Sequence, residues 1–484
     1  MIAIFHRRLG GAFACLALAA AACSSESPVV IEEVSGTFVY SYWQDDGTKV
    51  DVVPAGAAVR ALVPDASGAY QEYPGTVAAN GSFVVPGVPQ GTFFLEARSS
   101  LSVPAFGEHT ARSGLDLGRD IVGRKDVMAA GPNTILNVNV TGVDPWQGTD
   151  SMALLSSGAN LSLATGGAVL NPGDTSGQVQ YGLNGRNLPR TADTVHVYQL
   201  RDAGAVGAGT VRVATRAGSF TSVDVADMVP TDVNVPLSTA PQTGSVAVDW
   251  KTSQFETYKL QMAPSGSTYS HELAVEVVPH STAPMPVLPA AAALLQLSAH
   301  DVTPDQALGS LPYGQSLPSY WKEVRRARYT AVYSLSAAGG SINADFRASI
   351  QVRDPQPASG AIVPRVSPPR SPRLNGVDAM QNQPTSGLTP TFAWSAPALG
   401  TPTDYVLDLL SVKASGGSTV VTSVYTMRVL GTQVTVPSGV IKGGTIHVAL
   451  LTARVRPSVP VTSPGRQALP DASAAAVLAA FGAF

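Results

Sequence analysis

Short runs of alternating apolar and polar residues, separated by turn-forming residues, dominate this chain of 484 residues. The first runs cover residues 34–42, 57–63, 82–85 and 92–97, and further ones cover 136–140, 211–216, 246–250 and 271–277. Glycine, proline, asparagine and aspartate interrupt them about every 8 to 12 residues, which is typical of antiparallel strands joined by tight turns. We therefore expect an all-β chain of tandem antiparallel β-sandwiches that follows a cleaved signal peptide and contains few short helices. Alanine-rich runs at 290–297 and 474–484 are the candidate helices.

The N-terminus has the pattern of a secretory signal peptide. Arg7 and Arg8 precede an apolar stretch over residues 9–22, which is too short to span a bilayer stably. Small residues follow at the cleavage position: Ala20, Ala21 and Ala22 lie directly before Cys23. Apart from Cys15 and Cys23 the chain contains no cysteine, so the fold needs no disulfide or thiolate metal site.

This segment resembles the lipobox of bacterial lipoproteins, in which small residues precede a cysteine that becomes acylated. The departure is Ala20, where the family prefers leucine, and Cys15 fits less well because Phe13 is bulky. The resemblance implies that Cys23 carries lipid, including palmitate, and that the lipid bilayer is a partner through this residue. Ser24 resembles the sorting position of lipoproteins of the outer rather than the inner membrane. Simple cleavage after Ala22 and an uncleaved helix are the alternatives.

Two later segments resemble known β-sandwich families. Gly36 to Val39 and the run from Asn80 through Val88-Pro89-Gln90-Gly91 to Leu95 resemble the transthyretin-like, carboxypeptidase-regulatory-like domain. Pro390, Trp394, Tyr405-Val406-Leu407 and Val436-Pro437 resemble a fibronectin type III domain, although His447 stands where that family usually has tyrosine. Both resemblances imply a β-sandwich and neither implies an activity.

These observations predict a linear organisation. The expected segments are a signal peptide at 1–22, a polar tether at 23–32, a transthyretin-like sandwich at 33–130, a large unassigned β-rich domain at 131–354, a proline-rich linker at 355–373, a fibronectin type III-like sandwich at 374–464 and a C-terminal tail, helical in part, at 465–484.

The sequence offers no motif for catalysis or for a cofactor. Gly-x-Ser-x-Gly, Walker A and dinucleotide-binding glycine patterns are missing, so we predict no catalytic residue, cofactor or metal site. His271-Glu272 resembles the start of a zinc motif, but His280 follows at nine residues rather than four, which favours surface or turn histidines. Glu108-His109 and His300-Asp301 are interpreted in the same way.

Three other groups of residues have ordinary structural interpretations. The acidic turns at 45–47 and 144–150 are expected to form turns rather than calcium sites. Tyr40, Tyr42, Trp43, Tyr313, Tyr320 and Trp321 are expected to pack in the core or at strand edges rather than to stack on sugars. Lys322, Arg325, Arg326 and Arg328 form the densest basic cluster, which is expected to be a solvated face and not a nucleic-acid site.

Together these features predict a non-catalytic lipoprotein of the bacterial cell envelope that acts as a structural, adhesion or ligand-binding module. Its partners would be the bilayer and a protein or glycan ligand, with no nucleic acid. The alternative is an exported enzyme or carbohydrate-binding protein with its site in residues 131–354.

Overall fold

The all-β prediction is confirmed: strands fill the computed structural model, whose only helical elements in the described residues are α1 (Thr252–Glu256) and the 3₁₀ turn η1 (Lys259–Gln261). The structure describes residues 31–44, 47–65, 68–100, 102–163, 166–263, 269–280, 292–315, 321–337, 342–353, 360–381, 387–415, 418–456, 463 and 470–483.

The N-terminal part is a sandwich of two sheets. Its strands are β1 (Ile31–Thr37), β2 (Tyr40–Trp43), β3 (Lys49–Val52), β4 (Ala58–Pro64), β5 (Tyr70–Pro74), β6 (Thr76–Val77), β7 (Ser82–Pro89), β8 (Phe93–Ser99), β9 (Ser102–His109), β10 (Leu115–Asp116) and β11 (Arg119–Val122). The sheet β10-β1-β7-β6 packs against β4, β8 and β9 around Val34, Phe83 and Phe93. A short ribbon, β11-β2-β3, extends from this sandwich.

A second sandwich follows in residues 131–240. Its strands are β12 (Ile135–Thr141), β13 (Ser151–Ser156), β14 (Leu161–Leu163), β15 (Gly167–Val169), β16 (Ser176–Gly182), β17 (Val195–Val206), β18 (Gly209–Phe220), β19 (Thr231–Pro236) and β20 (Ser238–Thr239). The sheet β15-β16-β12-β19 shares a core with β13 and β17, in which Val138, Leu154 and Val197 are fully buried. Alternation along β12 places its valines in this core and its asparagines outside.

The third part pairs a long sheet with a two-stranded cover. Its strands are β21 (Gly244–Trp250), β22 (Tyr269–His280), β23 (Leu295–His300), β24 (Gln306–Tyr313), β25 (Lys322–Ala337) and β26 (Ile342–Arg353). The antiparallel pair β21-β24 places Val246, Val248 and Trp250 in the same core as the inner side chains of β22 and β25.

The C-terminal part is again a sandwich. Its strands are β27 (Arg370–Leu374), β28 (Val377–Asp378), β29 (Thr391–Ser395), β30 (Asp404–Ser415), β31 (Ser418–Val429), β32 (Gln433–Thr435), β33 (Thr445–Val455), β34 (Ala472–Val477) and β35 (Phe481–Ala483). The sheet β28-β27-β29-β32 buries Phe392 and Trp394 in one core with Leu407 and Leu409 of β30.

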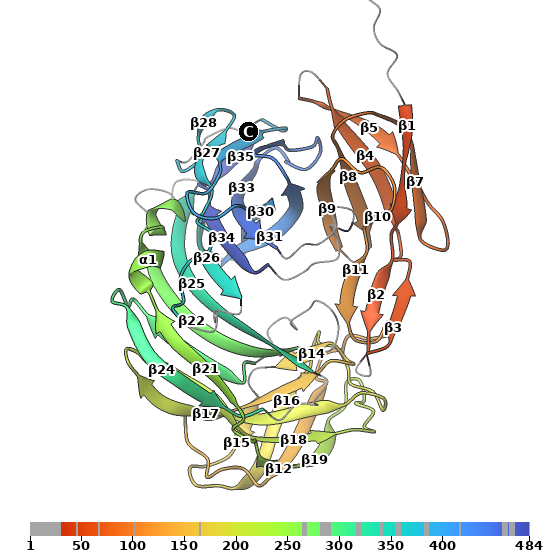
Figure 1. Ribbon diagram of the computed structural model, residues 1–484. Coiled ribbons are helices and arrows are strands. Elements are labelled where there is room, and N and C mark those ends of the chain that lie inside the picture. The colour runs from red at the N-terminus through yellow and green to blue at the C-terminus, as the bar shows by residue number, and fades with distance from the viewer. Residues whose placement is uncertain are drawn as a thin grey trace, which may run out of the picture.

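One continuous sheet passes through all four parts. Its hydrogen-bonded order is β14-β13-β17-β18-β23-β22-β25-β26-β34-β33-β30-β31-β9-β8-β4-β5. The pairing of β31 with β9 is parallel and joins the C-terminal part to the N-terminal part. In Figure 1 the parts follow one another around a ring.

The remaining contact of the ring lies between the N-terminal part and the second sandwich. The backbone N–H of Arg124 donates to the carbonyl of Gly158 at 2.8 Å. Its guanidinium Nε also donates to Oδ1 of Asp193 at 2.8 Å, and the Asp193 side chain is almost completely buried. These contacts follow β11, and in Figure 1 the N-terminal part meets the second sandwich below β11, away from β9.

The helix predictions for the alanine-rich runs were wrong. Ala472–Val477 and Phe481–Ala483 are strands β34 and β35, and the run at 290–297 ends in β23, with residues 290 and 291 outside the described part. Strand β34 lies between β26 and β33, and its alanines 472, 474, 475 and 476 are all buried. Small side chains fit this crowded position, so tertiary packing overrides the helix propensity of alanine.

Candidate functional site

The predicted anchor residues lie outside the described part of the chain. Ala20, Ala21, Ala22 and Cys23 all precede Ile31, where the description begins. The lipidation of Cys23 therefore stays a prediction. Within the residues that are described, no helix is long and apolar enough to cross a membrane.

A polar face of the continuous sheet runs across β18, β23, β22, β25 and β26. Direct cross-strand partners place their side chains on the same face of a sheet. The register joins Arg212 to Gln296, Gln296 to Glu276, Glu276 to Arg326 and Arg326 to Arg353. Arg328 lies two residues along β25 and points to the same side. We call this face the polar floor and define it by Arg212, Gln296, Glu276, Arg326, Arg328 and Arg353.

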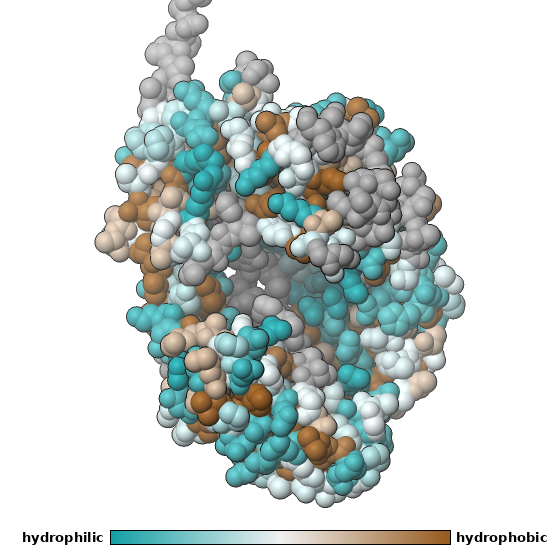
Figure 2. Space-filling view, turned by 180° about the vertical axis from the view of Figure 1, so that it is seen from behind, coloured by the Kyte–Doolittle hydropathy of each residue, from teal (hydrophilic) through white to brown (hydrophobic). Residues whose placement is uncertain are grey.

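The opposite face of the same strands is the hydrophobic core. The residues that alternate with the polar floor, Val211, Leu297, Val275, Ala327 and Val352, are all buried in one cluster beneath β21 and β24. The polar floor faces away from that core and its arginines are partly exposed. Figure 2 shows a hollow at the centre of the molecule whose wall on the side of β22 and β25 is hydrophilic.

Most arginines of the polar floor are held by carboxylates. Oε2 of Glu276 accepts from Nε of Arg326 at 2.6 Å, and Oε1 accepts from Nη2 of Arg328 at 3.0 Å. Arg353 forms an ion pair with Asp471, which precedes β34. These pairs fix the side chains across three strands and leave a surface with an excess of positive charge.

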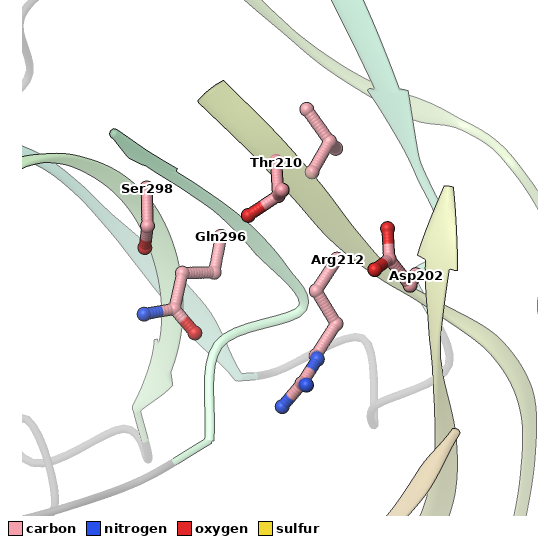
Figure 3. Close-up of a pocket in the computed structure, with 6 residues that line it drawn as sticks. Asp202, Thr210, Arg212, Gln296 and Ser298 are labelled. Carbon is pink, nitrogen blue, oxygen red and sulfur yellow. The ribbon is translucent and has the colours of Figure 1, made fainter. Parts of the chain in front are cut away.

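A pocket of about 230 Å³ opens at the Arg212 end of the polar floor. Its lining consists of Asp202 from β17, Thr210, Val211 and Arg212 from β18, and Gln296 and Ser298 from β23. In Figure 3 the polar ends of Thr210, Arg212, Gln296 and Ser298 point to the same side of these strands. The register explains this convergence, because Thr210 pairs with Ser298 and Arg212 pairs with both Gln296 and Asp202.

A buried ion cluster lies further along the same sheet, in the C-terminal part. Asp404 is fully buried and its carboxylate accepts from Nε of Arg428 at 2.6 Å and from Nε of Arg454 at 3.0 Å. Nε of Arg456 lies 3.4 Å from Oδ2 of Asp404. Burial by itself would raise the pKa of the Asp404 carboxyl, but the arginines outweigh it and hold this pKa below its ordinary value. The cluster connects β30, β31 and β33 and is structural.

Charged side chains also stabilise the junction between β9 and β31. The Tyr425 hydroxyl donates to Oε2 of the fully buried Glu96 at 2.6 Å, and Arg60 and Arg98 pair with the same carboxylate. Burial favours a raised pKa for Glu96, but these hydrogen bonds leave its pKa lowered. Oε2 of Glu108 accepts from the backbone N–H of Leu430 at 2.6 Å. The N-terminal and C-terminal parts are therefore held together by these side-chain contacts as well as by the backbone hydrogen bonds between β9 and β31.

Two of the histidines expected at the surface or in turns are buried instead. His271 is 6% exposed, and its Nε2 hydrogen-bonds the carbonyl of Val302 at 3.1 Å while the ring stacks on Tyr329. His109 is fully buried and stacks on Phe93. Alternation along β22 places His271 on the face of the buried Leu273, Val275 and Val277, so its burial follows from the sequence pattern and the interpretation overlooked it. The burial of His109 depends on the pairing of β8 with β9, which sets it against Phe93.

The histidine pair that resembled a zinc motif is widely separated. His271 and His280 lie at opposite ends of the regular strand β22, about 30 Å apart at the usual rise per residue. Within the described residues, no three histidine, cysteine or acidic side chains lie close enough to hold a metal ion.

The aspartates at both ends of the 144–150 turn form ion pairs with arginines. Asp144 accepts from Nε of Arg216 at 2.6 Å, and Asp150 pairs with Arg201 at 2.8 Å. Both acids therefore stabilise the turn against β17 and β18, as the turn interpretation predicts. Of the 45–47 turn, residues 45 and 46 lie outside the described part.

The aromatic clusters pack as predicted. Tyr40, Tyr313 and Trp321 are buried, and the partly buried Trp43 donates its indole N–H to Asp120 at 2.8 Å. Tyr320 lies outside the described residues. The residues of the basic cluster lie on strand β25, but they do not form a single face. Arg326 and Arg328 belong to the polar floor, whereas Arg325 lies on the opposite face and its Nη2 donates to the Tyr313 hydroxyl.

Sequence reasoning missed the pocket residues Asp202, Arg212 and Gln296. The sequence does show that two of them are polar residues within apolar strands, since Arg212 lies between Val211 and Val213 and Gln296 lies between Leu295 and Leu297. The convergence depends on pairing between β18 and β23, which are far apart in the sequence, and a single sequence does not reveal it.

Comparisons with known proteins add no relative. No family model matches the chain, and no curated protein matches it either. The interpretation of the site therefore depends on its geometry.

Proposed function

We propose that this chain is a non-catalytic lipoprotein of the bacterial cell envelope that binds a ligand on the polar floor. Acylated Cys23 would hold it at a membrane, the outer membrane in preference to the inner. The transthyretin-like and fibronectin type III-like segments would serve as β modules of the frame, and face-to-face packing of two sheets in each supports this assignment.

The observation that carries the proposal is the polar floor itself. Partly exposed arginines and polar side chains lie on a face whose reverse is a fully buried core. The strands that carry them belong to a sheet that continues through every part of the ring, so the side chains are held in a fixed array. Rigid elements position a binding site more accurately than loops do.

The second candidate function is an exported carbohydrate-binding protein or enzyme with its site in residues 131–354. The pocket beside Arg212 lies within this range, and its hydroxyl, amide and carboxylate groups suit a polyhydroxylated ligand. Glycoside hydrolysis generally requires two carboxylic acids across the scissile bond, and the pocket is lined by one, Asp202. The binding role is therefore favoured over hydrolysis.

Metabolic labelling with a palmitate analogue tests the anchor. The wild-type chain should incorporate label, Cys23→Ala should lose it, and Cys15→Ala should keep it. Equal labelling of wild type and Cys23→Ala would contradict lipidation at Cys23.

Binding of the full chain in detergent to a glycan and protein array tests the binding role. Saturable binding that disappears when Arg326 and Arg328 are both changed to glutamine would support a ligand site on the polar floor. Release of new reducing ends from a bound glycan would contradict the non-catalytic assignment.

A further inference from the structure

Arg212 differs from the other arginines of the polar floor in its partners. Arg326 and Arg328 share Glu276, and Arg353 pairs with Asp471. Arg212 has no carboxylate within ion-pair distance in the part of the chain that the structure describes. Its guanidinium forms part of the lining of the pocket.

The side chains around Arg212 supply further hydrogen-bond donors. Gln296, its direct partner on β23, contributes an amide, and Thr210 and Ser298 contribute hydroxyls from the next cross-strand pair. Figure 3 shows these three groups on the same side as the guanidinium. A planar guanidinium beside an amide and two hydroxyls matches the two oxygens and lone pairs of a carboxylate.

The same pocket favours hydroxyl groups next to that carboxylate. Asp202 lies opposite Arg212 in the register of β17 and β18 and offers acceptor oxygens. The hydroxyls of Thr210 and Ser298 can also accept hydrogen bonds. None of the six lining residues is aromatic, and the side chain of Val211 belongs to the core on the opposite face of the sheet. A neutral sugar would lack the ring platform on which sugars commonly stack, whereas an acid would gain the charge of Arg212.

We propose that this pocket binds the carboxylate of a hydroxy acid, either as a free small acid or as a uronic acid residue of a polysaccharide. The proposal rests on the binding role proposed above and names its ligand class. The cavity of about 230 Å³ is smaller than the ~300 to 1,000 Å³ of sites for drug-sized ligands and suits one sugar-sized unit.

Contact with the rest of the polar floor would distinguish a polysaccharide ligand from a free acid. Three strand spacings lie between Arg212 on β18 and Arg326 on β25, which corresponds to about 14 Å. A free acid would occupy the pocket alone. A polyuronate would extend across β22 and β25 and reach Arg326 and Arg328, whose side chains are 25% and 32% exposed.

Titration calorimetry on the full chain in detergent tests the proposal, with galacturonate, galactose and an oligogalacturonide as probes. Galacturonate should bind and galactose, which lacks the carboxylate, should bind at least about tenfold more weakly, because a hydrogen-bonded charge contributes about 1.5–3 kcal/mol. Tighter binding of the oligomer, lost when Arg326 and Arg328 are both changed to glutamine, would assign the polysaccharide. Equal affinity for monomer and oligomer would assign the free acid.

Four variants locate the site. Arg212→Gln should weaken galacturonate binding by about tenfold or more. Arg212→Lys should bind more tightly than Arg212→Gln but more weakly than the wild type, because lysine keeps the positive charge and lacks the paired N–H donors of the guanidinium. Asp202→Asn should tighten binding by removing a like charge. Arg347→Gln is the matched control, since Arg347 is an exposed arginine on β26 whose loss should leave affinity unchanged.

Three results would overturn the proposal: equal binding of galactose and galacturonate, no binding of either acid probe, or unchanged affinity in Arg212→Gln. Circular dichroism of each variant confirms that the sheet is retained. A chain that binds a neutral glycan or a protein on the array, but no carboxylate, would refute this ligand class and leave the proposed binding role intact.

Discussion

Replacement of Asp404 by asparagine should strongly destabilise the C-terminal sandwich. The carboxylate is fully buried and is shared by three arginines from two strands and the segment after β33, with Nε–O distances of 2.6, 3.0 and 3.4 Å. Asparagine keeps the shape but removes the negative charge, so that Arg454 and Arg456 remain as buried cations without compensation. Arg456 is only 5% exposed and burial already lowers its pKa to about 10.

The expected loss is about 3–5 kcal/mol, the usual cost of removing one partner from a buried ion pair. Hydrogen–deuterium exchange with mass spectrometry measures it locally, through the opening free energy of peptides from β30 and β33. Asp224→Asn is the control, because Asp224 pairs with Arg190 at 2.8 Å but is 61% exposed. That variant should lose less than about 1 kcal/mol.

The effect of Asp404→Asn should also depend on pH. The pKa of Asp404 is lowered in the folded protein, so its contribution to stability is present above the unfolded value of about 3.9 and is lost as pH falls through the folded pKa. The difference between wild type and variant should therefore shrink only in that acidic range. A loss below about 1 kcal/mol at pH 7 would refute the reasoning and show that desolvation of the four charges cancels their attraction.

Two further substitutions test the buried positions. His109 has a pKa lowered to about 4, mainly by burial and further by Arg428, so the unfolded chain binds more protons at this residue between pH 4 and 6.5. Burial lowers the pKa of His196 to about 4 as well. The loss of stability in urea from pH 7 to pH 5 should therefore be about 2 kcal/mol smaller in His109→Leu than in the wild type, because the contribution of His109 is removed while that of His196 remains. A decrease of the same size in His109→Leu would assign the pH dependence to other groups. Ala476→Leu in the crowded strand β34 should cost about 1–3 kcal/mol in thermal or urea unfolding, while Ala414→Leu at an exposed position of β30 should change stability by less than about 0.5 kcal/mol. Similar costs for both would indicate that β34 is less tightly packed than described.

The sequence predicted the strands well because each carries its own alternation. The runs at 57–63, 136–140 and 246–250 overlap β4, β12 and β21, and buried side chains alternate with more exposed ones along β12 and β21. Strand β34 was missed because it is buried on both faces, and a run of alanines there has no period to recognise.

The pocket was harder to predict than the strands that carry it. Arg212 and Gln296 each look like an ordinary outward-facing residue, and only the ladder between β18 and β23 brings them together. Glu96 and Tyr425 illustrate the same limit, since their hydrogen bond joins residues 329 positions apart. Alternation determines which face a side chain occupies, while long-range register determines its neighbours.

The parallel pairing of β9 with β31 has a consequence for how the chain is made. Glu108 and Leu430, which meet at this junction, are 322 positions apart, so β9 has no partner on that side until most of the polypeptide has been synthesised. Closure of so long a loop is slow, and an unpaired strand edge is a template for wrong pairing in the meantime. Folding of this protein should therefore depend on chaperones that hold the incomplete chain, and truncation before β31 should yield an aggregating N-terminal fragment.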